Sequence, residues 1–395
     1  MKLLHTSDWH LGQSFMGQSR LEEHYAFLEW LLTTIKEHKV DVLIVAGDIF
    51  DTATPPNYAL ELYYNFLTKL SLVCPHIIII AGNHDSIATL KAPKQLLASL
   101  HIDVIVTGDE EENEVVPIYN DKQELEAIVC GVPFLRDYVV RKSVDAQTLT
   151  EKELALTQGV QNHYKEVYEE ALKLKGDAQV PIIATGHFTT LGTTTSDSER
   201  DIYIGTTLNI ESGFLQSMFD YVALGHLHVN QKVGSECVRY SGSPIPLSFS
   251  EANNIKKVNI VSFESLTCKV QELAIPLYRK LIVLRGKTQE ILKQLETLQD
   301  QRVWVEVHLR DTNPFYANDI IRSKAKELGI TLLAVKIQKD EVALNKEDVK
   351  VLSLDELSPL ELFEKRLEKE NIKDKALFQE LRKHFQEIVD EVTHK

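Results

Sequence analysis

The stretch VDVLIVAGDIFD, residues 40–51, is the starting point for interpreting this chain. Its apolar residues 42–46 are followed by a glycine and then by the charged Asp48. A short apolar run that ends in turn residues is typical of a buried strand. A carboxylate at the end of such a strand is costly unless a cation or a hydrogen-bond donor lies nearby. We therefore expect Asp48 to lie at the carboxyl end of a buried strand and to bridge two metal ions.

Four further apolar runs end in the same kinds of side chain. They deliver Asp8 and His10, then Asn83, His84 and Asp85, then His187, and finally His226 and His228. In open α/β sheets, ligands bind outside the carboxyl ends of the strands. Divalent metals that hydrolyse phosphoesters prefer oxygen and nitrogen ligands, and this set contains no sulfur. Because a pair of ions can stabilise both the attacking and the leaving oxygen, the pattern predicts a two-metal hydrolytic site.

Composition limits the class of protein. The 395 residues are too many for one compact core, so we expect two or three domains. No apolar run approaches the roughly 20 residues of a membrane helix, and the start of the chain lacks a signal-peptide pattern. The cysteines are scattered, and we expect them to be reduced in a cytoplasmic protein without membrane contact. The formal net charge of −15 argues that any DNA contact is local, or is shared with a more basic partner.

The pattern changes after residue 275. Strand-like and helical segments then alternate in the order β-α-β-α-β, which predicts a small α+β domain. We divide the chain into an α/β domain at 1–275, the small domain at 276–340, a charged linker at 341–355 and two helices at 356–395. The run GKT at 286–288 resembles the end of a P-loop, but Leu281 stands where the first glycine should be, so we reject nucleotide binding there.

Several segments have more than one interpretation. Residues 58–70 are apolar almost all round, which is typical of a core helix but also of a helix in a dimer contact. We expect a second short helix at 91–100 and a solvated surface turn in the acidic loop 109–114. The two terminal helices each carry one apolar stripe, which would be buried if they folded back on the small domain, paired with each other or docked on a partner. Because a two-helix unit this short is marginal alone, we expect residues 356–395 to be a partner-docking segment.

Taken in order, the motifs are Asp8-Trp9-His10, Gly47-Asp48, Gly82-Asn83-His84-Asp85, Gly186-His187 and Gly225-His226-Leu227-His228. They resemble the calcineurin-like metallophosphoesterase superfamily and, more narrowly, the nuclease subunits of bacterial SbcCD-type complexes. The narrower resemblance includes HTSDWHLGQ, VAGDIFDTATPP, AGNHDSIATL and RYSGSPIPLSF, and it covers nearly the whole chain. It implies a metallophosphoesterase α/β sandwich with an added small capping domain that contacts DNA.

The resemblance also implies a role for each motif residue. Two manganese ions would be bound, one by Asp8, His10, Asp48 and His228, and the other by Asp48, Asn83, His187 and His226. His84 would donate a proton or stabilise charge beside the scissile phosphate, and Asp51 and Asp85 would orient ligands. The spacing of the residues alone leaves zinc, iron and manganese open. We expect the remaining histidines, His24 included, to be ordinary surface or core residues.

The function implied is a nuclease that acts as a double-strand exonuclease and as a hairpin and single-strand endonuclease. It would work with an SbcC-type ATPase in DNA repair, replication and recombination, as a homodimer within a heterotetramer. A stand-alone metallophosphatase or nucleotide phosphodiesterase is the alternative, and a DNA-end scaffold with a vestigial site is a third possibility. The added small domain and terminal helices favour the nuclease, and the complete set of ligands argues against the scaffold.

Overall fold

The computed structural model describes residues 1–109, 112–140, 149–199, 210–264, 266–299, 302–311 and 314–337, together with Leu381, His384 and Phe385. The chain divides into two compact units, Met1–Gln338 and Lys339–Lys395. Apart from those three residues, the expected linker at 341–355 and the expected terminal helices at 356–395 lie outside the described residues.

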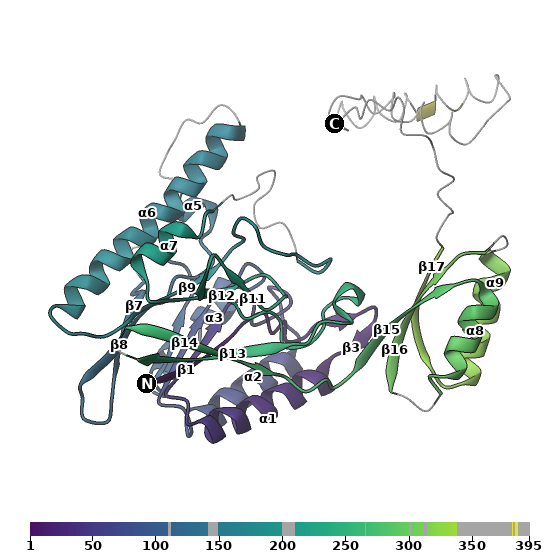
Figure 1. The fold of residues 1–395 in the computed structure, drawn as a ribbon, viewed down its shortest axis with the longest axis horizontal. Helices are drawn as coiled ribbons and strands as arrows, with labels where there is room; N and C mark the ends of the chain where they lie inside the picture. Colours follow the sequence, from purple (N-terminus) through teal and green to yellow (C-terminus); the bar gives the residue numbers. More distant parts are fainter. Residues whose placement is uncertain are drawn as a thin grey trace. The chain divides into compact units, whose positions relative to one another are not determined.

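Two six-stranded sheets form the centre of the first unit (Figure 1). The first sheet has the order β14 (Thr267–Ala274), β13 (Lys257–Glu264), β1 (Lys2–Thr6), β4 (Val42–Ala46), β5 (His76–Ile80), β6 (Ile102–Ile105). The second has the order β11 (Gln231–Val233), β12 (Ser235–Tyr240), β10 (Tyr221–Gly225), β9 (Ile182–His187), β8 (Leu125–Cys130), β7 (Val115–Tyr119). Strands β1, β4, β5 and β6 run parallel, as do β8, β9, β10 and β12. The mixed α/β fold class expected from the sequence is confirmed.

Burial on both faces explains why the sequence of β4 is apolar at every position. Val42 and Ile44 belong to the core between the two sheets, whereas Leu43 and Val45 belong to the core beneath the helices. Because successive side chains point to opposite faces, a strand covered on both faces must be apolar at every position. Each such side chain contributes roughly 1.5–3 kcal/mol when it is fully buried.

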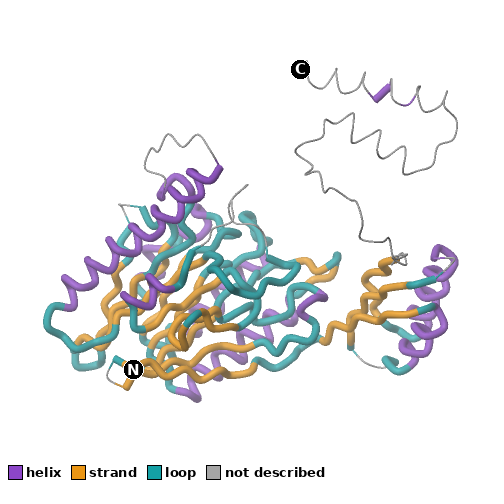
Figure 2. The backbone as a smooth tube through the Cα atoms, turned by 45° about the horizontal axis from the view of Figure 1, so that its top comes forward, coloured by secondary structure: helices purple, strands orange, loops and turns teal. Residues whose placement is uncertain are grey.

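Helices cover the outer face of each sheet (Figures 1 and 2). Residues of α1 (Leu21–His38) and α2 (Asn57–Leu70) pack against the first sheet, and residues of α6 (Leu149–Lys175) and α7 (Gly213–Met218) pack against the second. Helix α2 buries Tyr63 and Phe66, which favours the core interpretation of residues 58–70. None of the helices in the described part of the chain is long and apolar enough to cross a membrane.

Two local expectations were wrong. Residues 91–100 do not form one helix but belong to α3 (Ile87–Lys91) and α4 (Lys94–Ala98), because Pro93 between them has no amide hydrogen and its ring disfavours a continuous helix. The loop 109–114 is not simply solvated, since the Glu112 side chain is 3% exposed. Its carboxylate accepts hydrogen bonds from the backbone amides of Val106 and Thr107 at 2.8 and 2.6 Å.

A third correction concerns the cysteines. Cys237 on β12 and Cys268 on β14 form a disulfide, whereas Cys74 and Cys130 are free and buried. The expectation of reduced thiols is therefore wrong for the first pair. These two residues are 31 positions apart and lie on strands of different sheets, so their spacing in the sequence did not reveal the pairing.

The small domain has the β-α-β-α-β order that its sequence predicted. The strands β15 (Lys280–Gly286), β16 (Val303–Leu309) and β17 (Thr331–Ile337) form a parallel sheet. Helices α8 (Thr288–Glu296) and α9 (Pro314–Glu327) cover one face of this sheet (Figures 1 and 2). Val305 and Val307 of β16 belong to one buried cluster with Ile291 of α8 and Ile321 of α9. Trp304 belongs to a separate cluster, in which it contacts Phe15 of β2 (Ser14–Phe15).

Candidate metal centre

The predicted ligands meet at one edge of the sandwich. The first sheet contributes the residues after β1, β4 and β5, and the second contributes the end of β9 and the residues after β10. The structure brings together three groups whose ligand atoms lie within 4.8 Å of one another: Asp8, His10 and His228; His10, Asp48 and His84; and Asp48, His187 and His226. The carboxyl ends of strands from both sheets therefore form a single site.

Glycines allow the two sheets to approach each other closely at this edge. A Cβ atom on Gly225 of β10 would lie 1.8 Å from the carbonyl oxygen of Ala46 on β4. A Cβ atom on Gly47 would lie 2.3 Å from the His187 ring, and Gly47 also has a positive φ of 89°. Any larger residue at these positions would push the ligands apart.

The backbone of the site is strained. Asp8, His10, Asp48 and His226 have φ values of 53°, 47°, 49° and 93°. Positive φ is costly for residues other than glycine and persists where the surrounding structure enforces it. Here the amide of Asp8 donates to the carbonyl of Gly47 at 3.0 Å, and the amide of His10 donates to the carbonyl of Asp48 at 3.0 Å. The strain turns the ligand side chains toward the same edge.

Asp48 lies between the two sets of predicted ligands. Its Oδ2 is 3.2 Å from Nε2 of His187 and 3.6 Å from Nε2 of His10. Its Oδ1 accepts a hydrogen bond from the amide of His84 at 2.9 Å. Asp48 therefore lies beside residues of both predicted ligand sets, and its role as a bridge between two ions stays a prediction.

The other ligands are oriented by hydrogen bonds. His187 Nδ1 donates to the carbonyl of Ala46 at 2.9 Å, which leaves Nε2 toward Asp48 and the Asn83 amide oxygen, 3.0 Å away. Asp8 accepts hydrogen bonds from the amide of His226 at 2.9 Å and from the hydroxyl of Ser7 at 2.5 Å. Such partners set the tautomer and direction of metal-binding groups.

Asp85 holds two loops together and is not in any of the three groups. Its carboxylate accepts hydrogen bonds from the amides of Gly82, Phe50 and Ile49 at 2.8, 3.0 and 3.2 Å. Burial and the neighbouring Asp48 raise the pKa of Asp85 to about 6. Asp51 lies on the other side, with Oδ1 3.2 Å from His10 Nδ1, while its carbonyl is 2.8 Å from Nδ1 of the partly buried His84.

Opposing charges determine the electrostatics of the buried site. Burial disfavours the charged form of Asp48, yet His187 and His10 hold its pKa well below the usual range. Burial likewise disfavours protonated His187, but the Asp48 carboxylate raises the pKa of His187 to about 9. Neither ring nitrogen of the buried His10 has a well-aligned hydrogen-bond partner among the residues that the structure describes. The site thus gathers buried carboxylate, amide and imidazole groups, and some of these lack well-aligned hydrogen-bond partners. Such groups are suitable ligands for divalent metal ions.

Sequence reasoning missed the residues that surround His228. Ser198, Glu199, Glu251 and Lys256 all contact it or its immediate neighbours. The only signal was the charged Glu251, two residues after the motif RYSGSPIPLSF. His24 is a buried residue of α1, and burial lowers its pKa to about 3.

Comparison with known proteins shows which families this chain resembles. Residues 1–230 match the family described as calcineurin-like phosphoesterase, and residues 277–371 match the one described as type 5 capsule protein repressor C-terminal domain. The D subunit of the nuclease SbcCD from Escherichia coli K12 is 39% identical over 384 residues, which cover 94% of each chain.

Two further proteins of the same name are also similar. The one from Bacillus subtilis 168 is 29% identical over 90% of this chain and 91% of its own. The one from Rhodobacter capsulatus is 34% identical over 75% of this chain and 76% of its own. The chain therefore belongs to the calcineurin-like phosphoesterase family and, within it, to the D subunits of SbcCD nucleases.

Proposed function

We propose that this chain is a metal-dependent DNA nuclease that cleaves duplex ends, hairpins and single strands together with an SbcC-type ATPase. Its role would lie in DNA repair, replication and recombination. The position of Asp48 between two ligand groups carries the proposal, because it matches the geometry of two-metal phosphodiester hydrolysis. The related proteins are named as nucleases, which supports a nucleic acid as the substrate.

The working ions would be two manganese ions. Asp8, His10, Asp48 and His228 would hold one, and Asp48, Asn83, His187 and His226 would hold the other. Bound divalent ions would stabilise negative charge on the phosphodiester and supply a nucleophile near neutral pH. The ring of His187 is already oriented for this role by the Ala46 carbonyl.

His84 would act on the substrate. Its amide donates to Asp48 and its Nδ1 is 2.8 Å from the Asp51 carbonyl, so both its backbone and its ring are held in place. When the ring is protonated at both nitrogens, Nε2 is the atom that would give a proton to the leaving oxygen or stabilise charge on the phosphate. Asp85 would hold the loop after β5 in place, and Asp51 would orient the ring of His10.

The test is a manganese-dependent assay on hairpin DNA, blunt duplex DNA and a small phosphodiester, with and without the ATPase and ATP. We expect cleavage of DNA, and none by the Asp48→Ala variant. Hydrolysis of the small diester alone would support a stand-alone phosphodiesterase. Binding to DNA ends without hydrolysis of any substrate would support a scaffold.

The domain boundaries and the ATPase contact are part of the proposal. Residues 1–275 would form the nuclease domain, 276–340 the DNA-contacting cap, 341–355 a linker, and 356–395 the docking segment for the ATPase. Deletion of 351–395 should leave manganese-dependent cleavage measurable and abolish association with the ATPase. Co-purification of the truncated chain at normal affinity would place that contact elsewhere.

We also propose a homodimer within a heterotetramer, with α2 and the α3–α4 region as the contact. Leu62 of α2 packs partly against the core, whereas Leu96 of α4 is 69% exposed. Leu96→Glu should therefore yield monomers that retain metal, and a sedimentation measurement checks this. If the Leu96→Glu variant remains a dimer, the contact between the two copies lies elsewhere on the chain.

A cytoplasmic location is proposed as well, although the Cys237–Cys268 disulfide is unusual there, because cytosolic thiols are normally kept reduced. Fractionation of cells that express the tagged chain should recover it together with cytoplasmic marker proteins. Recovery with markers of an oxidising compartment would contradict this location.

A further inference from the structure

His228 is held at three points. Its ring Nδ1 lies 2.5 Å from the hydroxyl of Ser198. Its amide donates to Glu199 at 2.7 Å, and its carbonyl accepts from Lys256 Nζ at 2.9 Å. The ring, the amide and the carbonyl of one predicted ligand are therefore all fixed by side chains outside the ligand set.

Glu251 connects these contacts. It is fully buried in η1 (Phe249–Glu251), and its carboxylate forms an ion pair with Lys256 at 2.5 Å. It also accepts a hydrogen bond from the Ser198 hydroxyl, and its Oε1 lies 3.7 Å from His228 Nδ1. The contacts form a relay from imidazole to hydroxyl to carboxylate, which is consistent when Nδ1 carries the proton and Nε2 faces the metal edge.

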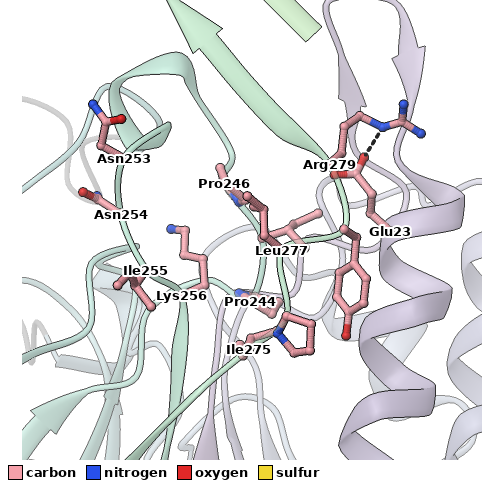
Figure 3. A pocket seen from close by; sticks show the side chains of 13 residues that line it. Glu23, Pro244, Pro246, Asn253, Asn254, Ile255, Lys256, Ile275, Leu277 and Arg279 are labelled. Carbon is pink, nitrogen blue, oxygen red and sulfur yellow. Dashed lines mark ion pairs between the residues drawn. The ribbon is translucent and has the colours of Figure 1, made fainter. Parts of the chain in front are cut away.

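Lys256 completes the arrangement. It is 6% exposed and lines a cavity of about 170 Å³, shown in Figure 3, together with Pro244 and Pro246. Its ammonium group donates to Glu251, to the Ser243 hydroxyl at 2.8 Å and to the His228 carbonyl. A buried pair of this kind is weak evidence for stability, because desolvation offsets the attraction between the charges. Its position against a predicted ligand requires another explanation.

We propose that Glu251 and Lys256 are positioning residues that fix the tautomer and direction of His228 for metal binding. The inference rests on the proposed function, since it assigns His228 to an ion. The comparison with His187 supports it. The ring of His187 is oriented by a backbone carbonyl, whereas His228 has a hydroxyl in that place, backed by a carboxylate. A carboxylate behind a metal-binding histidine orients the ring and raises its basicity.

The test compares Mn²⁺ binding by calorimetry in the full chain and its variants. Glu251→Gln should weaken one of the two sites by about 10–100-fold and leave the other unchanged. The double variant Glu251→Gln/Lys256→Met removes both buried charges and should show the same loss. Glu306→Gln is the matched control, because Glu306 is 2% exposed and pairs with Lys336 at 2.8 Å in the small domain. It should leave both sites intact.

Wild-type affinity at both sites in a folded Glu251 variant would overturn the inference. If the Glu251 variants do not fold, Ser198→Ala decides, because it removes only the hydroxyl between the carboxylate and the ring. Weaker Mn²⁺ binding at one site then supports the relay, and unchanged binding overturns it. A wild-type chain that takes up no Mn²⁺ would instead contradict the proposed function, and this inference with it.

Discussion

Two regions of the first unit bury charged side chains, and they do so in opposite ways. At the metal edge, Asp8, Asp48 and five imidazole rings crowd together, and His10 has no well-aligned hydrogen-bond partner among the described residues. At the junction with the small domain, every group of the fully buried Arg20 has a partner. Its guanidinium donates twice to Glu23 at 2.7 Å and once to the Pro246 carbonyl at 2.8 Å.

Aromatic rings complete the junction. Trp304 of the small domain stacks on Phe15 with ring centres 5.6 Å apart. The guanidinium groups of Arg20 and Arg279 lie 5.2 and 4.7 Å from the Trp304 ring. Cation–π contacts of this kind stabilise a charge that has left water. Buried charge alone therefore does not mark a functional site: the Arg20 guanidinium is satisfied within the chain, whereas we expect cations to complete the metal edge.

Removal of the carboxylate that both predicted ligand sets share should have the largest effect on the metal edge. Asp48→Ala should lose both metal ions, because both ligand groups depend on that side chain. Nuclease activity should fall to the level of the metal-free protein. Elemental analysis checks the first point, and two ions still bound per chain would contradict the bridging role.

His84 separates chemistry from metal binding at the same edge. His84→Ala should retain both ions and reduce hydrolysis by about 10²–10⁴-fold, the usual contribution of a positioned acid. Because His84 also lies within 4.8 Å of His10 and Asp48, metal content must be measured alongside the rate. A parallel loss of metal and activity would make His84 a ligand.

Substitutions at the junction should lower the free energy of unfolding and leave metal binding unchanged. Trp304 is 4% exposed, so Trp304→Ala should lower the free energy of unfolding by about 3–5 kcal/mol. Tyr316→Ala in the same domain is the control, since Tyr316 is 67% exposed and should change stability by less than about 0.5 kcal/mol. Denaturant unfolding with Mn²⁺ titration separates the two effects, and a loss of metal in Trp304→Ala would mean that the regions are coupled.

His5 is a buried titratable group that the fold keeps neutral. Burial between the sheets lowers its pKa to about 3, while its ring contacts the Tyr221 hydroxyl at 2.9 Å. The unfolded chain takes up the proton near pH 6.5 and the folded protein does not, so this contribution to stability is present at higher pH and is lost as the pH falls. Between pH 8 and 5 the wild type should lose about 2 kcal/mol more than His5→Gln. Equal pH dependence in unfolding experiments would contradict the neutral form.

Much of the fold could be predicted from the sequence because its signals are local. The apolar run ending at Asp48, and the four that end at Asp8, Asn83, His187 and His226, are strands or lead directly from strands in the structure. Parallel strands place their carboxyl ends at a common edge, so the gathering of the motif residues followed from the strand assignments. Their roles at two metal ions stay predictions.

The tertiary structure alone decided which distant groups meet. Arg20 reaches Pro246 across 226 positions, Ser198 reaches Glu251 across 53, and Cys237 pairs with Cys268 on another sheet. Glu112 and Glu251 are charged residues that the sequence alone would place in solvent, yet both side chains are buried, and Lys94 donates to Glu112 while Ser198 donates to Glu251. Periodicity reports which face of an element is apolar, but the burial of a charge depends on partners that packing brings to it from near and far in the chain.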